Sequence, residues 1–240
     1  YLSIYLSIYL SIYLSILIFS FPILIDANTP APRAAQPAAS STTSTASSTP
    51  SRQDADQLEL DAALLAAAER SRLEEIRSLL DRGANINAVD ANKWTPLHRA
   101  SRYGHHQCVE LLLDRGANIN TVDIGKSTPL HYASRYGHHQ CIELLLDRGA
   151  NINAVGHSNN TPLHYASRFD CHQCIELLLD RGANINAVDN INFTPLHWAS
   201  ISCHHQCVEL LIDRGADKSI NDVREDGRDS LLHLLLYEPS

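Results

Sequence analysis

The string Thr-Pro-Leu-His occurs at residues 95–98 and returns at 128–131, 161–164 and 194–197, so its start positions are 33 residues apart each time. A strict period of this length is typical of stacked supersecondary units, none of which can bury its apolar face alone. Such a stack presents an extended surface. The first function that the spacing indicates is therefore binding, and catalysis ranks well below it.

One unit is expected to contain two short helices. Thr95 is a suitable N-cap, and Pro96 falls at the first helical position, where its missing N–H costs nothing. Gly104 allows a left-handed turn into a second helix, and Gly116 ends that helix. Both helices are shorter than the roughly 12 to 15 residues at which an isolated helix becomes marginally stable, so neighbouring units must stabilise each other. The second helix carries its apolar side chains at helical spacing, at Cys108, Val109, Leu112 and Leu113.

The composition divides the chain into three zones. Residues 1–25 are apolar and uncharged, residues 26–57 are rich in Ala, Ser, Thr and Pro, and residues 58–240 carry the repeats. The middle zone has too few large apolar side chains to offset its ordering entropy, so we expect a disordered linker there. The formal net charge of −8 argues against a protein held on nucleic acid by phosphate contacts.

The apolar segment 1–25 has two explanations. It opens with Tyr-Leu-Ser-Ile four times over, as a translated four-base microsatellite would. It is also long enough, at about 1.5 Å per helical residue, to act as a membrane anchor or signal. The sequence leaves both explanations open, and a membrane-tethered protein follows only from the second.

Four of the six cysteines share one phase of the repeat, which makes them packing residues. Six cysteines are few for a disulfide scaffold, so thiols in a reducing compartment are expected, and with them a cytoplasmic or nuclear location. The four in-phase cysteines are Cys108, Cys141, Cys174 and Cys207.

Three elements recur in phase: Thr-Pro-Leu-His, then Gly-His, then Leu-Leu-Leu-Asp-Arg-Gly-Ala-Asn-Ile-Asn. In these elements the chain resembles ankyrin-repeat proteins. The resemblance implies an all-α solenoid of antiparallel helix pairs, with projecting β-hairpin-like fingers that form a concave face together with the first helices. The four full units are 95–127, 128–160, 161–193 and 194–226. A degenerate unit, 62–94, precedes them, and a partial C-terminal cap, 227–240, follows them.

The chain departs from the family pattern at two kinds of turn. Between the helices of a pair, the usual glycine is replaced by Asp170 and then by Cys203. Asp tolerates the left-handed conformation, whereas at Cys203 we expect either strain or a rebuilt turn. The unit 194–226 is therefore expected to be the weakly ordered end. At the finger tips the family's glycine is replaced by Lys93, Lys126, Asn159 and Asn192, which makes the finger geometry less certain than that of the helices.

Catalytic and metal-binding functions are not favoured. The histidines are copied once per repeat, whereas a catalytic site needs one singular geometry, and no phosphate-binding loop or nucleophile motif is present. The ligand types and their spacing permit zinc at Cys171 to Cys174 and Cys203 to Cys207. Adjacent helices pack about 8 to 10 Å apart, whereas Zn–S bonds of about 2.3 Å need much closer sulfurs. We therefore predict a non-enzymatic protein without metal or cofactor.

The positions that ankyrin-repeat proteins use for partners carry arginine beside aromatic rings. Such groups can bond carboxylates and form cation–π contacts, so we expect a monomer that binds a protein partner through an acidic or phosphorylated segment, and no nucleic acid. The alternative is that recent duplication copied these residues without a function. The predicted partner-binding residues are Trp94, Arg102, Tyr103, Arg135, Tyr136, Arg168, Phe169 and Phe193.

A hypothesis of another class concerns four asparagines at the end of the Gly-Ala-Asn-Ile-Asn element. Their context resembles sites that an asparaginyl hydroxylase modifies in ankyrin-repeat proteins, so the chain could be a substrate or sink for such an enzyme. These asparagines are Asn87, Asn120, Asn153 and Asn186.

Overall fold

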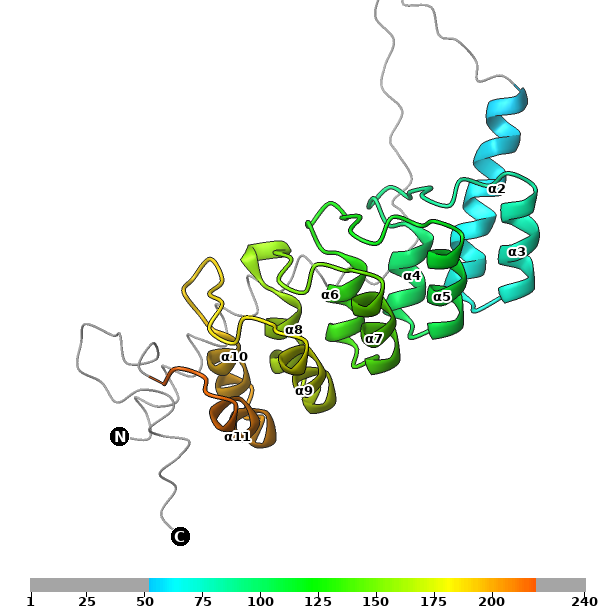
Figure 1. The fold of residues 1–240 in the computed structure, drawn as a ribbon. Coiled ribbons are helices and arrows are strands. Elements are labelled where there is room, and N and C mark those ends of the chain that lie inside the picture. Colours follow the sequence, from blue (N-terminus) through cyan, green and yellow to red (C-terminus); the bar gives the residue numbers. More distant parts are fainter. Residues whose placement is uncertain (1–51, 219–240) are drawn as a thin grey trace, which may run out of the picture. The chain divides into compact units, whose positions relative to one another are not determined.

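The computed structural model describes residues 52–218, which form ten α-helices and one short 3-10 turn, η2 (His157–Asn159) (Figure 1). The helices follow one another in pairs along the chain. The pairs are α2 (Arg52–Glu69) with α3 (Leu73–Asp81), α4 (Pro96–Arg102) with α5 (His106–Asp114), α6 (Pro129–Arg135) with α7 (His139–Asp147), α8 (Pro162–Arg168) with α9 (His172–Asp180), and α10 (Pro195–Ile201) with α11 (His205–Asp213).

The helix pairs stack into two rows. The first helices of the pairs, α2, α4, α6, α8 and α10, pack side by side and form the first-helix row. The second helices, α3, α5, α7, α9 and α11, form the outer row (Figure 1). Each pair contacts its neighbours in sequence, so the predicted all-α solenoid is confirmed.

One continuous apolar core runs between the rows. Each first helix of the four full units contributes a leucine that is at most 1% exposed: Leu97, Leu130, Leu163 and Leu196. Removing one such side chain from water stabilises the fold by about 1.5 to 3 kcal/mol. The outer row supplies the opposite wall of the core through Val109, Leu112, Ile142, Leu145, Ile175, Leu178, Val208 and Leu211.

The turn between the two helices of a pair keeps one conformation in every full unit. Gly104 and Gly137 have φ of +72° and +75°, and Asp170 and Cys203 follow them at +59° and +58°. The turn at Cys203 is therefore not rebuilt. A cysteine held there carries a left-handed strain of about 1 to 2 kcal/mol.

The fingers are tight turns, and residues 52–218 contain no β-strand. In the finger of the unit 95–127, one carboxylate oxygen of Asp123 accepts hydrogen bonds from the backbone N–H groups of Gly125 and Ser127, both at 2.8 Å. Asp90 and Asp189 close their fingers in the same way. These bonds hold the tip residues Lys93, Lys126 and Asn192 at φ of +60° to +61° without a glycine.

The finger of the unit 128–160 is different. Gly156 replaces the aspartate, and the chain forms η2 with two consecutive left-handed residues, Ser158 and Asn159. A Cβ at Gly156 would lie 3.0 Å from Nε2 of His131, so a side chain here would crowd that ring. The finger geometry thus follows the presence or absence of one aspartate.

The first helix begins before the predicted domain start at residue 58. Helix α2 starts at Arg52, with Asp54 in its first turn and a hydrogen bond of 2.8 Å from Gln57 to Asp61 four residues later. These local contacts extend the helix into the predicted linker. No helix within residues 52–218 is long and apolar enough to cross a membrane. The predictions for 1–25, for 227–240 and for most of the linker 26–57 lie outside the described residues.

Candidate protein-interaction site

The recurring Thr-Pro-Leu-His string builds a rigid start to each first helix. In α4, the Thr95 N–H donates to Nδ1 of His98 at 3.1 Å, and the His98 N–H donates back to the Thr95 hydroxyl at 3.3 Å. The opposite ring nitrogen, Nε2, donates to the carbonyl of Ser127 at 3.1 Å. The histidine is therefore neutral, and it ties the helix start to the end of the next finger. His131, His164 and His197 repeat the capping box.

Burial lowers the pKa of all four capping histidines. His131 is 1% exposed, and desolvation lowers its pKa to about 4. The pKa values of His98, His164 and His197 are lowered by the same cause. These histidines are structural, and none is available as an acid or base near neutral pH.

A second set of histidines latches each unit to the one before it. Nε2 of His105 donates to the backbone carbonyl of Glu69 at 2.9 Å. In the same way, Nε2 of His138 donates to the carbonyl of Arg102, and Nε2 of His204 donates to the carbonyl of Arg168, at 2.9 and 3.0 Å. In α9 this position is Cys171, whose thiol donates to the carbonyl of Phe169 within its own turn instead. The boundary between the units 128–160 and 161–193 therefore lacks the latch.

Restoring this latch is expected to stabilise the protein. Cys171→His places an imidazole next to Gly137, which leaves room for it as Gly104 does for His138. We expect the free energy of unfolding to rise by about 1 kcal/mol, the value of one net hydrogen bond. Urea denaturation would measure it, with Cys171→Ser as the control that adds no latch. Equal stability of the two variants would contradict the role of the latch.

The four candidate hydroxylation sites form a further inter-unit clasp. The side-chain carbonyl of Asn120 accepts a hydrogen bond from the backbone N–H of Asn151 at 3.0 Å. Each of the other three asparagines accepts the same bond from the backbone N–H of the residue 31 positions later in the sequence. The recurrence of these asparagines is therefore explained by a structural role. The other clasps are Asn87 to Asn118, Asn153 to Asn184 and Asn186 to Asp217.

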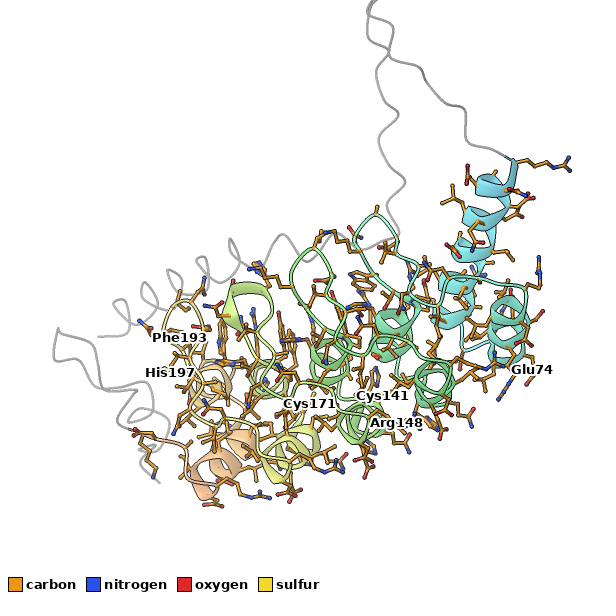
Figure 2. The ribbon with its side chains drawn as sticks, turned by 45° about the horizontal axis from the view of Figure 1, so that its top comes forward. Glu74, Cys141, Arg148, Cys171, Phe193 and His197 are labelled. Carbon is orange, nitrogen blue, oxygen red and sulfur yellow. The ribbon has the colours of Figure 1, made fainter. Side chains whose placement is uncertain are left out.

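Four arginines at the ends of the outer helices each pair with an aspartate of the preceding unit. Arg148 pairs with Asp114 at 2.6 Å and Arg181 with Asp147 at 2.5 Å (Figure 2 labels Arg148). Arg115 and Arg214 repeat the arrangement with Asp81 and Asp180. Such exposed pairs add little stability, but they leave each of these cations with a carboxylate partner.

The predicted arginines and rings form a continuous stack, which we call the ladder. Arg102 lies 5.0 Å from the ring centroid of Trp94, 5.7 Å from that of Tyr103 and 5.3 Å from that of Tyr136. Arg135 then lies 5.6 Å from Tyr136 and 4.8 Å from Phe169. Arg168 lies 5.6 Å from Phe169 and 4.5 Å from Trp198. Cations and rings thus alternate from one unit to the next. The ladder comprises Arg102, Arg135 and Arg168 with Trp94, Tyr103, Tyr136, Phe169 and Trp198.

Arg102 and Arg135 of the ladder differ from the four paired outer arginines in their electrostatics. Within residues 52–218, neither Arg102 nor Arg135 makes an ion pair or a side-chain hydrogen bond, and both are partly exposed. The rings beside them are open to solvent, with Tyr103 at 43%, Tyr136 at 41% and Phe169 at 39% exposure. The ladder therefore offers cationic edges and aromatic surface to a ligand.

Trp198 joins the ladder although the sequence did not single it out. The residue that would continue the aromatic series after Phe169 is Ser202, and Trp198 in α10 supplies the ring over which Arg168 lies. Its indole N–H donates to Asp189 at 3.0 Å. A signal was available, because Trp198 directly follows the fourth Thr-Pro-Leu-His string, in phase with the aromatic Tyr132 and Tyr165.

Phe193 lies off the ladder. Its ring stacks on His197 with centroids 5.0 Å apart and meets Trp198 edge-on at 5.7 Å. Figure 2 labels Phe193 and His197. Trp94 packs against Tyr132 at 4.7 Å and also meets Arg102, so it is both a packing residue and a member of the ladder.

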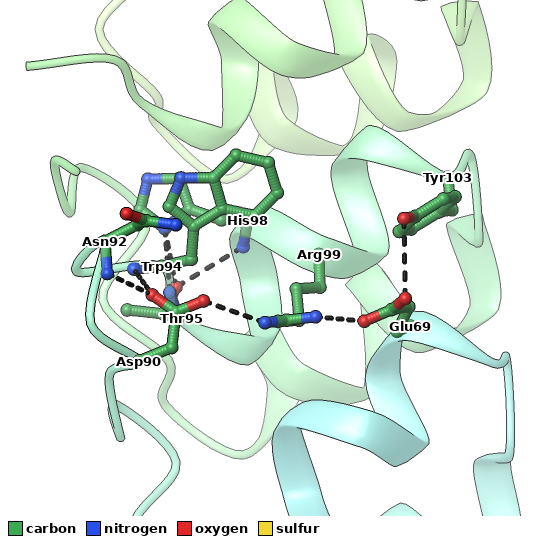
Figure 3. A network of polar contacts seen from close by, with 8 residues as sticks. All are labelled: Glu69, Asp90, Asn92, Trp94, Thr95, His98, Arg99 and Tyr103. Atoms are coloured by element: carbon green, nitrogen blue, oxygen red, sulfur yellow. Dashed lines mark hydrogen bonds and ion pairs between the residues drawn. The ribbon is translucent and has the colours of Figure 1, made fainter. Parts of the chain in front are cut away.

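A polar network holds the first end of the ladder in place (Figure 3). Arg99 bonds Glu69 of α2 and, at 2.8 Å, Asp90 of the finger. The Tyr103 hydroxyl donates to the other oxygen of Glu69 at 3.4 Å. Unlike Arg102, Arg99 pairs both of its terminal guanidinium nitrogens with carboxylates of its own chain.

Within the described residues, the cysteines are not gathered with other side chains as metal ligands would be. Residues 52–218 contain no group of three or more His, Cys, Asp or Glu side chains that could hold a metal ion. Cys174 and Cys207 lie in the core at 1% exposure or less. Burial raises the pKa of Cys207 to about 12, which disfavours the thiolate that a metal requires.

Comparison with known proteins agrees with this architecture. A family model of ankyrin repeats in three copies matches residues 47–123, 64–156, 119–189 and 155–222. The matches cover more than half of the chain, which therefore belongs to the ankyrin-repeat family. Ankyrin repeats are generally protein–protein interaction modules.

A shorter stretch is similar to ankyrin repeat domain-containing protein 49 of Bos taurus. The two are 47% identical over 47 residues, which are 19% of this chain and 20% of the relative. The chain therefore matches about a fifth of the length of that curated relative.

Proposed function

We propose that this chain is a non-enzymatic adaptor or scaffold that acts as a monomer and binds an acidic or phosphorylated protein segment on its ladder. One observation carries the proposal. Four outer arginines each have an aspartate from the preceding unit, whereas Arg102 and Arg135 have aromatic rings and no carboxylate within residues 52–218. A ligand carboxylate or phosphate would supply the missing counter-charge.

The stacking geometry suits such a ligand. A ring on the face of a guanidinium leaves its N–H groups pointing outward in the plane, where a carboxylate or phosphate can accept two of them at once. The rings also fix the arginine rotamers, which reduces the entropy lost on binding. Exposed tyrosine and phenylalanine beside the cations provide apolar contact for an aromatic residue of the partner.

The same contrast bears on the duplication alternative. Copying a unit copies all of its arginines, yet within residues 52–218 the four outer arginines have aspartate partners, whereas Arg102 and Arg135 have no carboxylate partner. Duplication explains why the ladder repeats, and it leaves the cationic edges of the ladder without a role.

An affinity capture with matched charge variants tests the interaction site. The full chain would be compared with R102Q/R135Q, which removes two ladder cations, and with R148Q/R181Q, which removes two outer cations. Both variants change the net charge equally, and glutamine keeps part of the aliphatic stem. We expect a cellular partner that the parent and the outer variant retain and the ladder variant loses. Equal retention by the two variants would place the binding site elsewhere.

A further inference from the structure

The N-terminus of α9 carries two cysteines three residues apart. Cys171 is the N-cap, with φ of −95° and ψ of 67°, and its side chain is partly exposed. Cys174 lies in the first turn and is 1% exposed. The N-cap of the other full units is a histidine, so this Cys-x-x-Cys arrangement is confined to α9 among the outer helices that the structure describes.

The two thiols interact and have different environments. A hydrogen bond with the Cys174 thiol lowers the pKa of Cys171, and the same bond together with burial raises the pKa of Cys174. The exposed backbone N–H groups at a helix N-terminus also favour a thiolate there. Cys171 is thus the accessible nucleophile and Cys174 is the protected second thiol, the division of roles that a dithiol exchange requires.

We propose that Cys171 and Cys174 form a dithiol modification site that exchanges with low-molecular-weight disulfides such as oxidised glutathione. The Cys171 thiolate attacks one sulfur of glutathione disulfide, whose S–S bond breaks and releases one glutathione thiolate. Cys174 then gives its proton to solvent, attacks the Cys171 sulfur of the mixed disulfide and releases the second glutathione. The two cysteines lose two electrons, and one glutathione disulfide is reduced to two glutathione thiols.

Closure needs a small movement at the start of the helix. Residues three apart on a helix have Cβ atoms about 5 to 6 Å apart, whereas a disulfide needs about 3.5 to 4.5 Å. Cys171 can supply the difference because its dihedrals are not helical and no histidine latch ties it to the preceding unit. The disulfide would also remove the thiol hydrogen that Cys171 donates to Phe169, a residue of the ladder.

The chain contains a matched control in the next unit. Cys203 and Cys207 are four residues apart, Cys203 occupies the left-handed inter-helix turn, and the Cys207 thiol donates to Asp170 at 3.2 Å. This pair has one exposed and one buried thiol as well, but it lacks the N-cap and first-turn arrangement. We expect it to stay reduced where the α9 pair closes.

Mass spectrometry of the full chain tests the proposal. The protein would be equilibrated with mixtures of reduced and oxidised glutathione, alkylated and digested with trypsin. Arg168 and Arg181 release one peptide, 169–181, that contains these two cysteines and no others. We expect this peptide to lose both alkylation sites together and to become two hydrogen atoms lighter. The disulfide between Cys171 and Cys174 should form about ten times faster than any disulfide in the peptide that carries Cys203 and Cys207.

Two single variants separate the steps. Cys174→Ser should trap Cys171 as a mixed disulfide with glutathione, and Cys171→Ser should leave Cys174 unmodified because it is buried. Continued protection of Cys108 and Cys141, both 0% exposed, shows that each protein is folded. The proposal is overturned if both α9 thiols stay alkylatable in excess oxidised glutathione, if Cys171 pairs with Cys203 or Cys207, or if Cys171→Ser leaves the modification of Cys174 unchanged.

Discussion

Acidification from pH 7 to pH 5 is expected to lower the free energy of unfolding by about 2 kcal/mol through His131 alone. The unfolded chain binds a proton at this histidine near its ordinary pKa of 6.5, whereas in the folded chain the pKa is lowered to about 4. Stability is therefore complete above pH 6.5 and is lost as the pH falls toward 4. His98, His164 and His197 have lowered pKa values and act in the same direction.

The main cause of the lowered pKa of His131 is desolvation by burial. The capping box acts in the same direction. Nδ1 of His131 accepts a hydrogen bond from the Thr128 N–H at 3.0 Å. A proton on Nδ1 would therefore face the Thr128 N–H, and the two donors would repel each other. Nearby Asp123 favours the charged form, and His98 opposes it, but desolvation is the larger effect.

Urea denaturation at pH 7 and pH 5 measures this loss, with His131→Gln as the comparison. The variant should be less stable at pH 7, and its stability should depend less on pH, by about 2 kcal/mol over this range. The same pH dependence in both proteins would show that His131 titrates normally in the folded state.

Gly104→Ala is expected to cost about 3 kcal/mol, more than most single substitutions at an exposed turn. Gly104 has φ of +72°, so alanine carries left-handed strain of about 1 to 2 kcal/mol. The new Cβ would also lie 2.5 Å from Nδ1 of His138, which must move and loosen its bond to the Arg102 carbonyl. The loss of that inter-unit latch adds about 1 kcal/mol or more.

Gly116→Ala is the matched control for this substitution. Gly116 has φ of +87°, and nothing lies within 4 Å of a Cβ added there. It should therefore show the backbone strain alone. A double-mutant cycle of Gly104→Ala with His138→Ala would then isolate the clash, because the two substitutions should cost less together than the sum of their separate costs. Equal costs at Gly104 and Gly116 would mean that the latch contributes nothing.

Much of the fold follows from the sequence because it depends on local chemistry. The Thr-Pro start, the inter-helix glycine and the terminal Gly116 act within a single helix pair, and the structure confirms the helices they delimit. Their repetition in phase identifies the family. The finger turns were less accessible, although Asp90, Asp123 and Asp189 were visible at one phase and their side chains set the turn.

The contacts between units were harder to predict because they join residues that one helix pair does not contain. The Asn120 clasp, the His138 latch and the Arg148 ion pair connect positions 31, 36 and 34 residues apart. These sequence separations identify contacting residues only when it is known how neighbouring helix pairs are placed against each other. The contact of Trp198 with Arg168 was hard to predict for the same reason, because Arg168 lies in the unit that precedes the unit of Trp198.

The proposal that the ladder binds an acidic segment is tested most directly with peptides of defined charge. An array would present acidic and phosphorylated peptides with aromatic residues, each beside a counterpart in which Gln replaces every Glu. Titration calorimetry of the strongest peptide would then compare the full chain, R102Q/R135Q and R148Q/R181Q. The ladder account predicts weak binding of the Gln counterparts, an affinity loss of about tenfold or more for R102Q/R135Q, and affinity within about twofold of the parent for R148Q/R181Q. Equal binding of the Gln counterparts, or equal losses in the two variants, would contradict it.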